Sequence, residues 1–292
     1  MTGPDRVGLG WRGELAAGIF EHLSALDVLE VIAEDGWHTG RREAAALADL
    51  ARARPLMLHG VTLGLASCSP VAGWRLDRMA RLVERVQPEA WSEHLAFVRA
   101  GGVEIGHLAA PPRCAATVEG AVANVSRAAR VVGAAPLLEN IATLIDPPGS
   151  TLDEPAWVGQ VLRGAGAGAL LDLHNLHANA LNFGHDPVRM LHRLPLERVA
   201  VVHVAGGGWI EHAGVAPRWL DDHVHAVPEA VFVLLQALAA AVQQPLTVVL
   251  ERDGRYPAFG TLLAELQQAR DALARGRAQQ AGPTLVAQRR AA

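Results

Sequence analysis

Short apolar runs alternate with longer amphipathic stretches along the 292-residue chain. The short runs are almost continuously apolar, as expected for parallel strands that are buried on both faces. They lie at Arg6–Trp11, Val28–Glu34, Leu56–Val61, Ala90–Phe97, Pro136–Asn140, Ala169–Asn175, Val199–Ala205 and Thr247–Asp253. Helical periodicity predicts helices near Gly13–Leu26, Arg41–Arg54, Gly73–Gln87, Ala115–Val132, Glu154–Gly164, Pro187–Arg193, Pro228–Val242 and Ala258–Ala274.

Strand–helix alternation repeated eight times is typical of an α/β protein built as a single (β/α)8 TIM barrel. We therefore predict one catalytic barrel domain over residues 1–275. Residues 276–292 are rich in Ala, Gln and Arg, and we expect them to form a flexible C-terminal tail. The glycine-rich segment Gly206–Leu220 is predicted to be a loop after the seventh strand.

Composition narrows the classes of protein that fit this chain. Half of the residues are apolar, the net charge is -4 and no long basic run is present, which argues against nucleic acid as a partner. The two cysteines, Cys68 and Cys114, are too few for a disulfide scaffold and favour a reducing, cytoplasmic location. We expect no membrane span, because the longest apolar stretches are too short and one contains Gln236.

Polar side chains with metal-binding chemistry close most of the predicted strands. They are His59, His94, Glu139, Asp172, His203 and Glu251, and Asp221 and His223 follow the glycine-rich segment. The C-terminal ends of barrel strands meet at one mouth, so we expect these side chains to converge there. Asp221 and His223 would share one face in an extended chain. Asn175 can meet Asp172 only if the chain turns at the strand end.

Four of these residues are carboxylates, and Asp and Glu are rarely buried without a partner. Arg252 could relieve one of them, whereas multivalent cations would relieve all four. A single histidine in an apolar run is ordinarily a core residue, so the inference rests on the whole set. Histidine with carboxylate and without cysteine suits Fe, Mn, Zn or Co, and the number of donors predicts two or three ions. Glu30 and Glu34 could support this site, bind substrate or simply be solvated.

Several separated motifs between Val7 and Tyr256 carry a resemblance to a known family. They are GLGW, EVIAED, LHGVTLGL, SEHLAF, LLENIA, LLDLHNLHANALNFG, VHVAGG, DDHVHAV and LERDGRYP. Together they resemble the multinuclear non-haem iron-dependent oxidative enzymes, which include the oxygenase subunit of methanobactin biosynthesis and modify ribosomally made peptides. That family is similar in turn to the endonuclease IV and xylose isomerase barrels.

The resemblance implies a xylose isomerase-like barrel with a mixed-valent Fe(II)/Fe(III) site of two or three ions and O2 as co-substrate. The substrate would be a cysteine in a precursor peptide, and a partner protein would bind the peptide leader. Among the ligands, His94, Asp221 and His223 would be essential for catalysis. The implied metal ligands are His59, His94, Glu139, Asp172, Asn175, His203, Asp221, His223 and Glu251.

Two departures from the family pattern stand next to implied ligands. Glu93 replaces the usual Asp before His94, and His174 often is Asn in the family. Neither change removes a ligand position, and His174 or His177 could add one.

Three other functions compete with this interpretation. A zinc-dependent, endonuclease IV-like hydrolase would need a basic groove and would carry histidine at Asn175. A sugar isomerase would need a lysine near its metals, and the chain contains none. A non-enzymatic interaction protein on a decayed barrel would have lost ligands, and none is missing.

Overall fold

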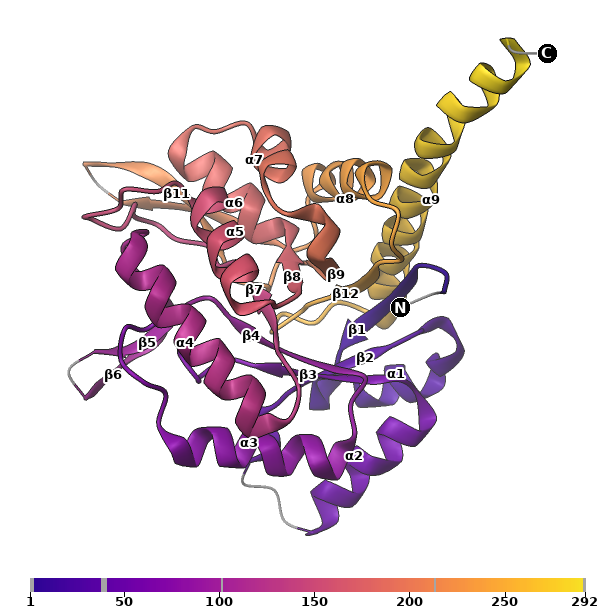
Figure 1. Cartoon of the computed structure of the whole chain (residues 1–292). Coiled ribbons are helices and arrows are strands. Elements are labelled where there is room, and N and C mark those ends of the chain that lie inside the picture. Colours follow the sequence, from indigo (N-terminus) through magenta and orange to yellow (C-terminus); the bar gives the residue numbers. More distant parts are fainter. Residues whose placement is uncertain (1–2, 38–40, 101, 213, 291–292) are drawn as a thin grey trace.

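The computed structural model describes residues 3–37, 41–100, 102–212 and 214–290. Eight parallel strands close into a barrel in the order β1-β12-β9-β8-β7-β4-β3-β2, which confirms the predicted fold (Figure 1). The barrel strands are β1 (Arg6–Gly10), β2 (Leu29–Ile32), β3 (Leu56–Gly60), β4 (Ala90–His94), β7 (Leu137–Glu139), β8 (Ala169–Asp172), β9 (Val199–Val204) and β12 (Thr247–Leu250).

Helices connect the strands and cover the outside of the barrel. The α-helices are α1 (Ala16–Glu21), α2 (Arg41–Ala53), α3 (Gly73–Val86), α4 (Ala115–Val132), α5 (Glu154–Ala165), α6 (Leu173–Phe183), α7 (Pro187–Arg193), α8 (Glu229–Ala241) and α9 (Phe259–Arg290). Short 3-10 helices lie at η1 (Gly13–Leu15), η2 (Leu23–Ala25), η3 (Glu34–Gly36) and η4 (Leu196–Arg198). No helix in the described part of the chain is long and apolar enough to cross a membrane.

A small apolar layer inside the barrel sets the height of the functional site. The layer consists of Val28, Met57, Leu170, Val201 and Val249, which form a cluster separate from the main core between strands and helices. Side chains alternate along a strand, so the residue two positions further points to the same side. Those residues are Glu30, His59, Asp172, His203 and Glu251. The alternation that builds the apolar layer therefore builds a polar layer directly above it.

Two antiparallel hairpins are inserted after barrel strands. The first joins β5 (Phe97–Ala100) to β6 (Val103–Ala109), and the second joins β10 (Gly207–His212) to β11 (Val215–Asp221). Both project from one side of the molecule, on the left in Figure 1. The prediction of a loop over Gly206–Leu220 was therefore wrong. Cross-strand pairing, with Trp209 opposite Trp219, outweighs the low strand propensity of the glycines.

The chain turns from strand to helix earlier than predicted at the sixth barrel strand. Strand β8 ends at Asp172, and α6 begins at Leu173, inside the predicted strand Ala169–Asn175. The Asp172 carboxylate caps α6 by accepting the backbone N–H of Asn175 at 2.6 Å. This cap is the turn that brings Asp172 and Asn175 together.

The last helix, α9, runs beyond its predicted end at Ala274 and continues to Arg290. Beyond Ala274 the Arg277 side chain bonds Asp5 near the start of the chain. A flexible tail over residues 276–292 stays a prediction.

Gly8 provides a test of how tightly the barrel closes. A Cβ atom at this position would lie 2.0 Å from the Val28 carbonyl oxygen. We expect Gly8→Ala to push β1 from β2 and to lower the free energy of unfolding by about 1–3 kcal/mol in urea titrations. Gly13→Ala is the matched control, because no atom lies within 4 Å of a Cβ there. Equal stability of the two variants would contradict this account of β1.

Candidate functional site

Glu139, at the end of β7, lies at the centre of the polar layer and is 1% exposed. Its Oε2 atom is 3.4 Å from His59 Nε2 and 3.3 Å from His94 Nε2. Its Oε1 atom is 3.2 Å from His203 Nδ1. Burial raises the pKa of Glu139, but the three imidazoles lower it by more, so the carboxylate is ionised. One carboxylate therefore faces three histidines from three different strands.

His203, at the end of β9, contacts two more buried carboxylates. Its Nε2 atom is 2.8 Å from Glu30 Oε1, and its Nδ1 atom is 2.9 Å from Glu251 Oε2. Neither ring nitrogen makes a hydrogen bond of acceptable geometry with any described residue. Burial lowers the pKa of His203, but Glu251 and Glu30 raise it well above its ordinary value. Glu30, whose role the sequence leaves open, thus belongs to this cluster of buried histidines and carboxylates at the mouth of the barrel.

Asp172 and Asn175 add oxygen atoms from the first turn of α6. Asn140 exchanges two hydrogen bonds of 2.9 Å with the Asp172 backbone and accepts the Asn175 side-chain N–H at 3.0 Å. The Asn175 amide nitrogen is therefore used, and Oδ1 is the atom left over. Burial and the neighbouring Asp221 and Glu139 raise the pKa of Asp172 well above its usual value.

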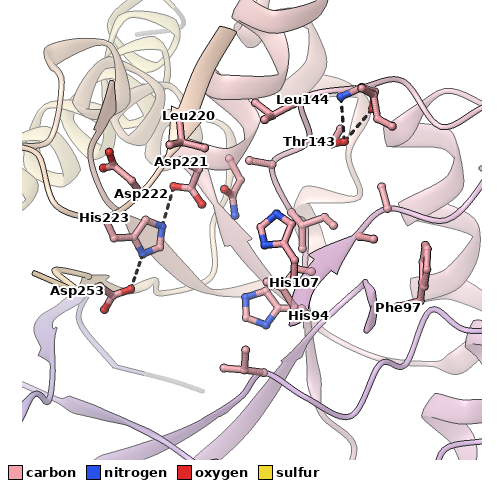
Figure 2. A pocket seen from close by; sticks show the side chains of 18 of the residues that line it. His94, Phe97, His107, Thr143, Leu144, Leu220, Asp221, Asp222, His223 and Asp253 are labelled. Atoms are coloured by element: carbon pink, nitrogen blue, oxygen red, sulfur yellow. Dashed lines mark hydrogen bonds and ion pairs between the residues drawn. The ribbon is translucent and has the colours of Figure 1, made fainter. Parts of the chain in front are cut away.

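A second branch of the site follows β11. His223 Nε2 lies 2.8 Å from Asp221 Oδ1, and His223 Nδ1 lies 3.4 Å from Glu251 Oε2 and 3.3 Å from Asp253 Oδ2 (Figure 2). The pair meets as predicted, but the reason given by the sequence was wrong. Strand β11 ends at Asp221, and His223 adopts a φ of 54°, in the left-handed region that non-glycine residues rarely occupy. Such conformations cluster at functional sites.

Burial and charge set the protonation of this branch. Burial raises the pKa of Asp221, but His223 and a hydrogen bond from His174 lower it by more, so the pKa lies below its ordinary value. Burial lowers the pKa of His223, and Asp221 and Glu251 raise it well above the usual value. The carboxylates of this branch therefore stabilise the protonated form of His223.

Four groups of these residues, three of which share members, have the spacing of metal sites. The groups are Glu30, His59 and His203; His59, His94 and Glu139; His174, Asp221 and His223; and Glu139, Asp172, His203 and Glu251. In each group, one potential donor atom per residue lies within 4.8 Å of the others. Every residue that the sequence predicts as a ligand is in one of these groups except Asn175, which is adjacent through its hydrogen bond to Asp172.

The unpaired atoms of the cluster fit metal ions. Within the cluster, the buried oxygens without a hydrogen-bond partner among the described residues are Glu30 Oε2, Glu139 Oε2, Asp172 Oδ2 and Asn175 Oδ1. Buried polar atoms are nearly always paired, so this concentration needs an explanation such as an ion. Nitrogen and oxygen donors without cysteine suit Fe, Mn, Co or Zn.

In His94 and His59, a polar contact holds the ring nitrogen that faces away from Glu139, as is usual for histidines that bind a metal ion. His94 Nδ1 lies 3.1 Å from the Gly60 carbonyl oxygen, which can only accept, so Nδ1 carries a hydrogen and Nε2 faces Glu139. His59 Nδ1 lies 2.8 Å from Ser92 Oγ. Burial lowers the pKa of His94, but Glu139 and Glu93 raise it to about 9. Without a metal ion the ring is therefore protonated at neutral pH.

Arginine side chains neutralise little of this charge. Arg252 turns away from the mouth and makes a buried ion pair with Glu265 of α9 at 3.0 Å. Arg12 bonds Asp253 and lies 3.9 Å from Glu251, at the edge of the cluster. Arg252 therefore does not relieve the strand-end carboxylates, as the sequence left possible.

The cluster opens into a cavity of about 750 Å³. Asp221, His223 and Asp253 form a polar side of this cavity, and Phe97 and Leu144 lie on the opposite side in Figure 2. The β5–β6 hairpin, the segment 141–148 and the end of β11 supply most of the wall. The hairpins that sequence patterns missed therefore shape the space in front of the site.

Buried polar contacts hold the wall segment after β7. Asn179 of α6 accepts the Thr143 backbone N–H at 2.8 Å and donates to the Ile141 carbonyl and to Glu154 Oε2, both at 2.9 Å. Arg113 lies 3.9 Å from the same Glu154 oxygen. Burial raises the pKa of Glu154 to about 7, and Arg113 offsets only part of that effect.

The fold and the site define a (β/α)8 barrel with clustered histidine and carboxylate side chains of metal-binding type at its mouth. The sequence pattern of the family described as "RiPP precursor modification enzyme MbnB/TglH/ChrH" matches residues 6–274. The chain belongs to this family of enzymes, which act on the precursors of ribosomally synthesised and post-translationally modified peptides. The resemblance drawn from the sequence is therefore confirmed.

Curated relatives extend over most of the chain. A "UPF0276 protein" of Streptomyces avermitilis is 36% identical over 274 residues, which are 91% of this chain and 55% of that protein. This chain thus spans about half the length of that relative. A "UPF0276 protein" of Bordetella bronchiseptica is 33% identical over 273 residues, which cover 94% of each chain.

Solved structures share the fold at low sequence identity. Endonuclease IV from Thermus thermophilus has a TM-score of 0.55 and 18% identity and covers 92% of this chain and 99% of its own. A xylose isomerase domain protein from Alicyclobacillus acidocaldarius has a TM-score of 0.58 and 17% identity and covers 93% of this chain and 99% of its own. These likenesses confirm the xylose isomerase-like barrel.

The raised pKa of Glu154 predicts a pH-dependent stability. From pH 4.5, the ordinary value, to about pH 7, the native state retains a proton that the unfolded state releases. The free energy of unfolding therefore falls across this window, by at most about 3 kcal/mol. We expect Glu154→Gln to match the unchanged protein at pH 5 and to be more stable at pH 8 in urea titrations of metal-free protein.

Asp153→Asn is the control for this measurement. The pKa of Asp153 is raised by burial but lowered overall by its Arg193 contact, so the carboxyl stays ionised above pH 5. Apart from a small change in the pKa of Glu154, which the Asp153 charge helps to raise, any effect of this variant should be constant between pH 5 and 8. A stability difference for Glu154→Gln that is equally constant would show that Glu154 does not titrate in this range.

Proposed function

We propose that this protein is a multinuclear iron enzyme that uses O2 to oxidise a cysteine side chain in a ribosomally synthesised precursor peptide. Membership of the precursor-modification family supports a peptide substrate. The observation that carries the proposal is the set of overlapping histidine and carboxylate groups at the floor of the cavity. One ion could not use all of these donors, so the proposal includes two or three.

The residues divide naturally among the ions. Glu139, Asp172, His203 and Glu251 would hold one ion, and His59 and His94 would hold a second together with Glu139. Asp221 and His223 would hold a third, with Asn175 Oδ1 as a further donor in this part of the site. Iron bound in mixed valence would bind the cysteine thiolate and activate O2, so that the thiol side chain is oxidised and O2 is reduced.

The chain itself contributes position and exclusion of water. Glu139 faces His94 with one carboxylate oxygen and His203 with the other, so it could offer a donor to each of two groups. Gly60 and Ser92 fix the rings of His94 and His59 from behind. The apolar wall around Phe97 and Leu144 would hold the peptide backbone and keep water from the reacting side chain. A partner protein that binds the peptide leader, in the cytoplasm, completes the proposal.

A zinc-dependent hydrolase of the endonuclease IV type is less well supported. Its substrate is a polyanion, whose binding needs positive charge. The cavity wall carries apolar Phe97 and Leu144 and the acidic Asp222, and the Arg12 guanidinium is already paired with Asp253. These features favour a peptide.

The ligand assignment can be tested with two adjacent aspartates. Asp221 contacts His223, whereas Asp222 bonds the Val224 N–H and His225, outside the cluster. We expect Asp221→Asn to lose bound iron, measured by elemental analysis and Mössbauer spectra after anaerobic loading, and Asp222→Asn to retain it. Glu139→Gln should lose the most, because it contacts two of the groups.

Metal also should stabilise the fold, because binding energy at a folded site is folding energy. Chelation should lower the melting temperature of the unchanged protein by about 5 °C or more. A protein that binds one ion or none, with a melting temperature insensitive to chelation, would refute the multinuclear site.

The reaction can be tested by mass spectrometry of a cysteine-containing precursor peptide, incubated with iron-loaded enzyme, its partner protein, reductant and air. We expect a mass change at cysteine that disappears without O2. His94→Gln and His223→Gln should lower the rate at least about 100-fold, since misplacement of about 1 Å can cost that much. His225→Gln is the control, because its ring bonds Asp222. Unchanged peptide together with nicking of abasic DNA by zinc-loaded protein would favour the hydrolase.

A further inference from the structure

His174 stands in the first turn of α6, and its side chain is completely buried against the site. Its Nδ1 atom lies 2.7 Å from Asp221 Oδ1. Spacing alone makes it a third candidate donor beside Asp221 and His223. The question is which of its two nitrogens, if either, has a lone pair to offer a metal ion.

A hydrogen bond from Trp219 of β11 determines which His174 nitrogen carries the hydrogen. Its indole Nε1–H donates to His174 Nε2 at 2.9 Å. An indole nitrogen can only donate, so His174 Nε2 must accept and carries no hydrogen. In the neutral ring the hydrogen is then on Nδ1, which donates it to Asp221. Both nitrogens are therefore engaged, and no lone pair remains for an ion.

The surroundings hold this arrangement rigidly. Asn182 of α6 accepts the Trp219 backbone N–H at 2.7 Å and donates to its carbonyl oxygen at 3.0 Å. The backbone of Gly207 lies so close to His174 that a Cβ there would be 2.7 Å from the ring carbon Cε1. The Trp219 indole and the imidazole are thus fixed from both α6 and the β10–β11 hairpin.

We propose that His174 is a positioning residue, not a metal ligand, and that Trp219 fixes its Nδ1–H tautomer so that it orients Asp221. This inference rests on the proposed function for the role of Asp221 as a ligand. The tautomer itself rests on the hydrogen bonds alone. The β10–β11 hairpin is then part of the metal site, although Asp221 alone among its described residues belongs to one of the groups with metal-site spacing.

The tautomer can be measured in the metal-free protein. Long-range proton–nitrogen correlation spectra of histidine-labelled protein distinguish a nitrogen that carries hydrogen from one that does not, and the His174 signals are assigned by their loss in His174→Asn. We expect hydrogen on Nδ1 and none on Nε2, and the same pattern after addition of zinc as a diamagnetic probe. A His174 Nδ1 that loses its hydrogen when zinc binds would overturn the proposal.

Variants separate positioning from ligation. The Asn side-chain amide reaches about as far as His Nδ1, so His174→Asn keeps a donor for Asp221, whereas His174→Leu does not. We expect His174→Asn to keep the iron content and Mössbauer spectrum of the unchanged protein. His174→Leu and Trp219→Phe should weaken the last-bound ion by about 10–100-fold. Trp219→Phe keeps an aromatic side chain but removes the N–H, together with part of the ring.

The outcomes distinguish this inference from the proposed function. If His174→Asn loses as much iron as Asp221→Asn while Trp219→Phe loses none, His174 is a ligand and the inference is wrong. If the unchanged protein binds no iron, the proposed function fails, whereas the tautomer measured without metal still supports the orienting hydrogen bond. A hydrogen on Nε2 in the metal-free protein overturns the inference whatever the iron content.

Discussion

Buried negative charge at one end of the barrel is the constraint on which the rest of the site depends. Glu30, Glu139 and Glu251 are each at most 4% exposed, and their oxygens approach the same few imidazoles. A carboxylate removed from water is very costly unless positive charge compensates it. When no metal is bound, protons on His94, His203 and His223 supply that charge. The carboxylates raise the pKa of these rings by more than burial lowers it. Metal ions can replace those protons.

The register of the parallel strands places these carboxylates and histidines side by side. Asp172 is paired with His203, and His94 with Glu139, on neighbouring strands. A slip of one residue would turn each ligand toward the helices and an apolar side chain toward the mouth. The apolar interior layer below prevents such a slip, since it would bury polar groups in the core. Packing and chemistry are therefore encoded by the same alternation along each strand.

That alternation also explains what the sequence could and could not predict. The barrel strands and the polar side chains at their ends follow from local runs of apolar residues, so the sequence could predict that His59, His203 and Glu251 meet at one mouth. Glu30 was ambiguous because its strand has polar residues at both Glu30 and Glu34, and only the closed barrel shows which one faces His203. Helix α6 was missed because the apolar run continues past Asp172. The hairpins were missed because their pairing partners, such as Trp209 and Trp219, must first be brought together across a turn.

The structure separates the fixed part of the site from the part that can vary. Most of the candidate donors stand on strand ends, whose positions the barrel determines, and His174 ties Asp221, which lies outside the barrel strands, to helix α6. The cavity wall instead comes from two hairpins and the segment after β7, which Asn179 holds in place. Changes in hairpin or wall sequence would therefore alter the shape of the cavity without moving the side chains on the strand ends. Trp219 is an exception, because it precedes the cavity residue Leu220 on β11 and also fixes the ring that orients Asp221, so a change at this position of the hairpin would reach Asp221.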